Sequence, residues 1–102
     1  MKRMAPTGVV VLALLGAVGG ASAAGDVQAG KAKSVICAAC HGAQGQGVGS
    51  NPALAGKSEA EIVQALQDFK SGKRANPMMK PFIGQLSDAD MANLGAYYAS
   101  LK

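Results

Sequence analysis

A run of five residues constrains this 102-residue chain more than any other feature. It reads Cys37-Ala38-Ala39-Cys40-His41 and holds the only two cysteines and the only histidine of the sequence. Residues three and four positions apart lie on one face of a helix, so a helix here would present both thiols and the imidazole together. The thiols could add to the two vinyl groups along one edge of a porphyrin, and the imidazole could reach the iron. This C-x-x-C-H pattern predicts covalent attachment of one haem c.

Two other kinds of site share part of the pattern. A structural zinc ion needs roughly four protein ligands, and this run supplies three. A redox-active C-x-x-C pair is expected beside a strand–helix–strand pattern, and no run in the chain is rich enough in β-branched and aromatic residues to read as its strand. A zinc site, or a disulfide between Cys37 and Cys40, stays as the alternative to haem.

The N-terminus has the layout of a secretory signal peptide. Lys2 and Arg3 form a short basic region, residues 9–18 form an apolar stretch, and Ala-Ser-Ala at positions 21–23 supplies small residues for cleavage. The glycines in and just after the apolar stretch make it a poor match to the roughly 20 apolar residues of a membrane-spanning helix. An uncleaved anchor is therefore the less favoured alternative.

We expect cleavage after Ala23, which makes residues 1–23 a removed signal peptide and residues 24–102 a single domain. Covalent haem attachment in bacteria takes place outside the cytoplasmic membrane. The N-terminus and the C-x-x-C-H motif therefore predict the same compartment, the periplasm.

The composition leaves little side-chain bulk for a core. The chain has no tryptophan, two phenylalanines and two tyrosines. A domain this short usually needs disulfides, a metal or a cofactor to be stable, and a haem would provide a large apolar body to pack against. The formal net charge of +4 falls to +2 without Lys2 and Arg3. No basic stripe with interleaved aromatic residues is present, so the composition argues against nucleic-acid binding.

Three segments of the mature chain have the signals of helices. The first is expected from about Asp26 to Cys40. The second begins at a capping box of Ser58 and Glu61 and ends at Gly72, and a third has an N-cap serine followed by acidic residues. In the third, Ser87 is the N-cap, and Asp88 and Asp90 lie in the first turn. The apolar positions available for burial are Val27, Ala32, Val35 and Ile36 in the first, Ile62, Val63, Leu66 and Phe69 in the second, and Met91, Leu94, Tyr97, Tyr98 and Leu101 in the third.

A glycine-rich segment covers residues 42–52, between the first two helices. It could be a flexible linker. It could instead be a tight loop whose missing side chains let the backbone approach a haem closely. The haem motif just before it makes us favour the tight loop.

The second axial ligand of the iron is expected to be a methionine. An electron carrier needs both axial positions filled, so that little rearranges when the charge changes, and the chain has no second histidine. Met91 lies on the apolar face of the last helix, where methionine usually fills a core. Met78 and Met79 lie in a loop stiffened by Pro77 and Pro81. One of these two is the expected ligand and the other packs, with the alternative that both only pack.

Three basic residues flank this loop. Lys73, Arg74 and Lys80 could be an ordinary solvated surface. They could equally pair with haem propionates or dock on an acidic partner, since surface charges steer encounters even where they add little stability.

These features together resemble the class I c-type cytochromes, in particular the small periplasmic monohaem carriers and single domains of the dihaem carriers of proteobacteria. The resemblance implies an all-α class I cytochrome c fold, with three main helices wrapped around one covalently attached haem. It covers nearly all of the chain from Gly25 onward and rests on Gly30, the haem motif with Gly42, and the segments 51–56, 76–79, 86–88 and 97–99.

The resemblance also implies particular contacts. The first and last helices should cross near Gly30 and Leu94. The backbone carbonyl of Pro52 should accept the other ring N–H of His41, which orients the imidazole and raises its basicity.

The position of the axial methionine relative to the following Leu-Ser-Asp segment implies Met79 as the ligand, with Met78 as the alternative. One departure is Ser34, which stands where many relatives have an aromatic or large apolar residue. A less fully packed helix crossing is expected there.

The sequence thus predicts a periplasmic electron carrier, rather than an enzyme, that cycles Fe(III)/Fe(II) on a haem c. Cys37 and Cys40 would form the thioethers, and His41 and Met79 would bind the iron. Expected partners are periplasmic or membrane-bound redox proteins, with no nucleic acid and no small-molecule substrate, and the protein should be a monomer. The alternatives are a haem c subunit of a larger oxidoreductase, or a haem enzyme or gas sensor with an open iron position.

Overall fold

The structure is a computed structural model that describes residues 25–101, so the expected signal peptide lies outside the described residues. This part of the chain is helical, with no strand and one isolated antiparallel bridge between Val48 and Asn51. None of its helices is long and apolar enough to cross a membrane. The helices are α2 (Val27–Lys33), α3 (Val35–His41), α4 (Glu59–Ser71), α5 (Lys80–Ile83) and α6 (Asp88–Ser100).

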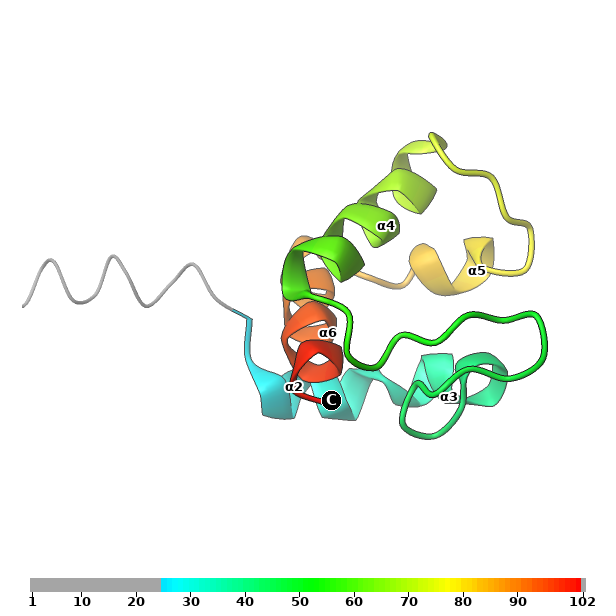
Figure 1. The fold of residues 1–102 in the computed structure, drawn as a ribbon. Coiled ribbons are helices and arrows are strands. Elements are labelled where there is room, and N and C mark those ends of the chain that lie inside the picture. The colour runs from blue at the N-terminus through cyan, green and yellow to red at the C-terminus, as the bar shows by residue number, and fades with distance from the viewer. Residues whose placement is uncertain (1–24, 102) are drawn as a thin grey trace, which may run out of the picture.

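The helices fall into two groups (Figure 1). α2, α3 and the loop that follows α3 form one group, and α4 and α5 form the other. α6 packs against both α2 and α4 and so joins the two groups. α5 is not among the predicted helices, because a four-residue segment containing Pro81 gives no periodic pattern.

The first expected helix is two helices in the structure, which corrects the prediction of one continuous helix. α2 and α3 are separated by Ser34. The Ser34 hydroxyl donates to the carbonyl of Lys31 at 2.7 Å, and such local side-chain bonds compete with regular helix. Ser34 is only 6% exposed, so this position is buried even though it lacks a large side chain.

The ends predicted for the second and third helices are confirmed. The Ser58 hydroxyl accepts from the N–H of Glu61 at 3.1 Å, and the Glu61 carboxylate accepts from the N–H of Ser58 at 2.9 Å. Gly72 ends α4 in the left-handed conformation, with φ of 85°. Ser87 and Asp90 form the same reciprocal box at the start of α6.

α2 and α6 cross with their backbones in close contact at Gly30. A Cβ atom on Gly30 would overlap the carbonyl oxygen of Asn93 and lie 2.8 Å from the Cβ of Tyr97. These two residues flank Leu94, which is fully buried, so the predicted crossing is confirmed. Gly95 allows a similar close backbone contact between α6 and α4, because a Cβ there would lie 2.9 Å from a carbonyl oxygen in the first turn of α4.

The buried core joins α4, α5 and α6. Met91 and Leu94 have no exposed surface, and Tyr98 is 2% exposed, so Met91 is the core residue that was expected. Ile36, Cys37, Leu54, Phe69 and Met79 pack partly buried against this core, whose members are Ile62, Leu66, Ile83, Leu86, Met91, Leu94, Tyr97 and Tyr98.

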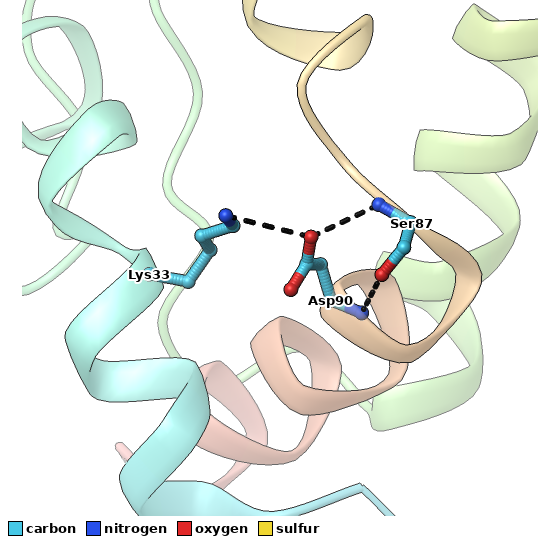
Figure 2. Close-up of polar contacts among 3 residues, drawn as sticks. All are labelled: Lys33, Ser87 and Asp90. Carbon is cyan, nitrogen blue, oxygen red and sulfur yellow. Dashed lines mark hydrogen bonds and ion pairs between the residues drawn. The ribbon is translucent and has the colours of Figure 1, made fainter.

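A polar junction connects α2 to the start of α6 (Figure 2). The Asp90 carboxylate accepts from the N–H of Ser87 at 2.9 Å and lies 3.5 Å from the ammonium of Lys33. The N–H of Ser87 is the main cause that lowers the pKa of Asp90 below its ordinary value, and the Ser87 hydroxyl and Lys33 add to it. The pair with Lys33 is partly solvated, so it adds at most about 1 kcal/mol.

Replacing Gly30 with alanine should destabilise the folded protein by about 1–3 kcal/mol or more, because the new methyl group meets backbone that cannot move aside. Gly84→Ala is the control. Gly84 has φ of −62°, and its Cβ would find nothing closer than 3.7 Å, so alanine there should be neutral or stabilising by about 0.4–1 kcal/mol. Urea unfolding of the haem-loaded protein, followed by circular dichroism, would measure both. Equal unfolding midpoints for the two variants would contradict the crossing.

Replacing Asp90 with asparagine should lower stability at neutral pH and leave it less changed in acid. A lowered pKa in the folded state means that the Asp90 carboxylate stabilises the fold above the ordinary aspartate pKa of about 3.9 and loses this effect as the pH falls below it. The free energies of unfolding of wild type and variant should therefore converge on acidification. Asp88→Asn is the control, since that side chain is 85% exposed and lies 3.9 Å from Lys70. A gap of constant size between pH 7 and pH 3 would refute the role of the Asp90 charge.

Candidate haem-binding site

Helix α3 carries the C-x-x-C-H motif on the wall of a cavity. Cys37 and Cys40 are both unpaired and half-buried, and His41 is 7% exposed. All three line the same cavity, as the i, i+3, i+4 spacing on a helix predicts. Met78 and Met79 line it too, although they lie almost 40 residues further along the chain.

The cavity has a volume of about 370 Å³, within the roughly 300–1,000 Å³ range of small-molecule and cofactor sites. Its walls are mostly apolar, with a few polar groups from the loops and from α4. The apolar wall residues are Ile36, Pro52, Leu54, Ile62, Ala65, Leu66, Phe69, Phe82, Leu94 and Tyr98, and the polar and charged ones are Asn51, Lys57, Glu61, Arg74 and Asn76.

The His41 ring is oriented by a backbone carbonyl. Its Nδ1 lies 2.8 Å from the oxygen of Pro52. A carbonyl oxygen can only accept, so Nδ1 carries the proton and donates it, which leaves the lone pair on Nε2. This is the His41–Pro52 contact that the resemblance implied, and it fixes the tautomer of the imidazole.

The methionine loop is held by Asn76. Its side-chain oxygen accepts from the N–H of Met78 at 3.0 Å, and its backbone carbonyl accepts from the N–H groups of Met79 and Lys80, each at 3.1 Å. Met79 then caps α5, whose first turn contains Pro81. The two methionines differ in exposure, because Met78 is 73% exposed while Met79 is partly buried against the core.

The surroundings of the Cys37 thiol disfavour thiol–disulfide exchange. Burial raises its pKa, and the hydrogen bond with the Tyr98 side chain offsets this only in part. Burial and the neighbouring Cys37 likewise raise the pKa of Tyr98. A raised pKa keeps the Cys37 thiol protonated at neutral pH, and the protonated form is inert in disulfide exchange.

The glycine-rich segment is a tight loop rather than a linker. The N–H of Gly47 donates to the carbonyl of His41 at 2.7 Å, and the carbonyl of Gly45 accepts from two later N–H groups of the same loop. Gly45 has φ of 69°, and a Cβ there would lie 2.5 Å from the Tyr98 ring. The loop therefore needs glycine both for its backbone conformation and for its contact with α6.

Two asparagine side chains with structural roles were not among the predicted site residues. Asn76 holds the methionine loop, and the Asn51 amide donates to the carbonyl of Cys40 at 2.9 Å. Both asparagines directly precede a proline, a pair of residues that marks turns, and this is the sequence signal that could have found them.

A second hollow of about 590 Å³ lies outside this site, between the end of α4, the segment that follows it and α5. It is larger than the cavity of the motif but contains neither cysteine, neither methionine nor the histidine. Lys70, Arg74 and Lys80 line it, and Arg74 also lines the first cavity, with its guanidinium 4.5 Å from the centre of the Phe69 ring.

Comparison with known proteins identifies the family. The sequence model described as Cytochrome c matches residues 27–102. The chain is also 45% identical over 91 residues to cytochrome c-554(547) of Halothiobacillus neapolitanus, an alignment that covers 78% of this chain and 100% of that relative. The chain belongs to the cytochrome c family, and the predicted class I c-type cytochrome fold is confirmed.

The similarity extends to one part of longer proteins. The chain is 45% identical over 95 residues to cytochrome c4 of Pseudomonas aeruginosa, covering 92% of this chain and 47% of that one. A crystal structure of reduced recombinant cytochrome c4 from Pseudomonas stutzeri superposes with a TM-score of 0.73 at 36% identity, covering 78% of this chain and 47% of that one. The chain thus spans about half the length of the cytochrome c4 relatives that it matches.

Family membership implies a covalently bound haem c with its iron, and the residues around the cavity fit this group. The walls are mostly apolar, as a porphyrin requires. Two unpaired thiols stand one helical turn apart on α3, and the imidazole beside them has its Nε2 lone pair available for a metal. Met78 and Met79 line the same cavity, and the thioether sulfur of methionine can bind a haem iron.

Proposed function

We propose that this protein is an electron carrier that holds one haem c in the cavity of α3. The observation that carries the proposal is that one cavity collects two free thiols, a carbonyl-oriented imidazole and a methionine loop. When bound, the haem supplies an Fe(III)/Fe(II) couple for single-electron transfer. In this proposal Cys37 and Cys40 form the thioethers, and His41 and Met79 are the axial ligands.

Burial favours Met79 over Met78 as the ligand. The Met79 side chain packs against the core beside the cavity, whereas 73% of Met78 is exposed to solvent. The Fe–S bond to methionine is weak and has to be held by its surroundings. The two backbone bonds to the Asn76 carbonyl and the start of α5 restrain Met79 in this way.

The work of these residues is to keep the ligands still while the charge on the iron changes. His41 is restrained through its ring by Pro52 and through its carbonyl by Gly47. Met79 is restrained by Asn76 and by α5. The cavity offers no second histidine as an acid or base, and this favours a carrier over an enzyme with an open iron position.

The proposal also covers the compartment in which the protein acts and its redox partners. Residues 1–23 direct export and are removed after Ala23, and residues 24–102 act in the periplasm as a monomer. The partners are periplasmic or membrane-bound redox proteins rather than nucleic acid or a small-molecule substrate. The sequence supports this through the basic, apolar and small-residue order of the N-terminus and through the modest net charge.

Absorption spectra of the exported protein, expressed with a haem attachment system, test the proposal. We expect the haem to stay with the chain under denaturing conditions, narrow bands in the reduced state, and the weak far-red band of methionine-ligated ferric haem in the oxidised state. Covalent haem without that band, together with ready binding of carbon monoxide, would replace the carrier with an open-site haem protein. Absence of haem would overturn the proposal.

Replacing Met79 with alanine should abolish the far-red band and open the iron to carbon monoxide, because the proposed sulfur ligand is gone. Met78→Ala is the matched control, since it removes the adjacent and mostly exposed side chain from the same loop. It should keep the spectrum of the wild type. The reverse pattern would make Met78 the ligand, and loss of the band in both variants would mean that the loop as a whole fails to form.

A further inference from the structure

The side chain of Asn51 connects the loop after α3 to the helix itself. Its amide Nδ2 donates to the carbonyl of Cys40 at 2.9 Å. Its backbone N–H and carbonyl both pair with Val48, at 3.0 and 3.1 Å, and close a four-residue turn. Asn51 is therefore fixed to the loop by its backbone and to α3 by its side chain.

The next residue makes a second bond to the next residue of α3. Pro52 O accepts from His41 Nδ1 at 2.8 Å, as Cys40 O accepts from Asn51. Both bonds join residues 11 positions apart, so they form a two-bond ladder with one register. A slip of the loop by one residue would break both bonds at once.

The Asn51 bond also acts on the backbone of the histidine. The Cys40 carbonyl belongs to the peptide group that contains the N atom of His41, so fixing this carbonyl orients the peptide before His41. The N–H of Gly47 fixes the peptide after it, through the His41 carbonyl. The residue before a proline is restricted to extended backbone conformations. This restriction on Asn51 limits the positions that Pro52 can take relative to α3.

We propose that Asn51 is a positioning residue for the haem iron, which sets the strength of the His41 hydrogen bond to Pro52 by holding the loop in register with α3. The inference rests on the proposed role of His41 as an axial ligand. A strong bond from Nδ1–H to a carbonyl raises the basicity of the imidazole, and a more basic ligand favours Fe(III) over Fe(II). Asn51 thereby keeps the reduction potential lower than it would be with a loosened loop.

The experiment compares Asn51→Ala with Gln46→Ala in the haem-loaded protein. Gln46 is the matched control, because its side chain accepts from the N–H of Gln44 at 3.0 Å within the same loop and takes no part in the bond between Pro52 and the His41 ring. Two quantities are measured: the midpoint reduction potential, and the exchange rate of the His41 Nδ1–H by proton NMR of the reduced protein. His41 is the only histidine of the chain, so its ring signal is readily assigned.

Asn51→Ala should shift the potential upward and speed exchange of the ring N–H by about tenfold, the factor that corresponds to one lost hydrogen bond of about 1.4 kcal/mol. Gln46→Ala should change neither quantity. Asn51→Gln keeps an amide donor on a longer side chain, so its potential and its exchange rate should lie between those of the wild type and of Asn51→Ala. If Asn51→Ala yields no folded holoprotein, Asn51→Ser is measured in its place.

Unchanged potential and exchange in the Asn51 variant would overturn the inference. Equal changes in the Asn51 and Gln46 variants would also overturn it, since they would show a general loosening of the loop. Failure of the proposed function has a different signature, because the wild type itself would then lack the spectrum of a haem with two axial ligands.

Discussion

Where α2 meets α6 at Gly30, two helix backbones touch with no side chain between them. α3 follows α2 after the single residue Ser34, so the crossing at Gly30 also determines where the cysteines and the histidine lie. α6 in turn contributes Leu94 and Tyr98 to the wall of the cavity and packs on α4 through Gly95. The separation of the cavity walls thus depends on contacts that only glycine permits.

The two loops that carry candidate ligand groups are built in a similar way. Each contains an Asn-Pro pair, and in each the asparagine side chain bonds to a backbone group, at Cys40 in one loop and Met78 in the other. The proline limits the backbone conformations of the preceding residue, and the side-chain bond of the asparagine then holds the loop in one of them. The two loops beside α3 are therefore restrained by these bonds, and a redox centre that rearranges little requires such restraint.

Most of the fold could be predicted because its signals are local. The capping boxes at Ser58 and Ser87 and the glycine at 72 define helix ends by contacts within a few residues. The break at Ser34 and the helix α5 escaped prediction, because a single serine gives no distinct stop signal and the four-residue α5 is too short to show a period. The Asn-Pro pair marks Asn51 as a turn residue, but it does not specify the partner of the Asn51 side chain, which lies 11 residues away.

The cavity draws its walls from α3, α4, α6 and both loops, so much of the interior of this small domain is also cavity wall. A covalently attached haem stays with the chain in both the folded and the unfolded state, but its apolar surface is removed from water only in the folded state, so it favours folding. Chains that have received no haem therefore spend more time open to proteases than chains that have. The amount of this protein in a cell should therefore depend on the supply of haem as well as on the rate of synthesis.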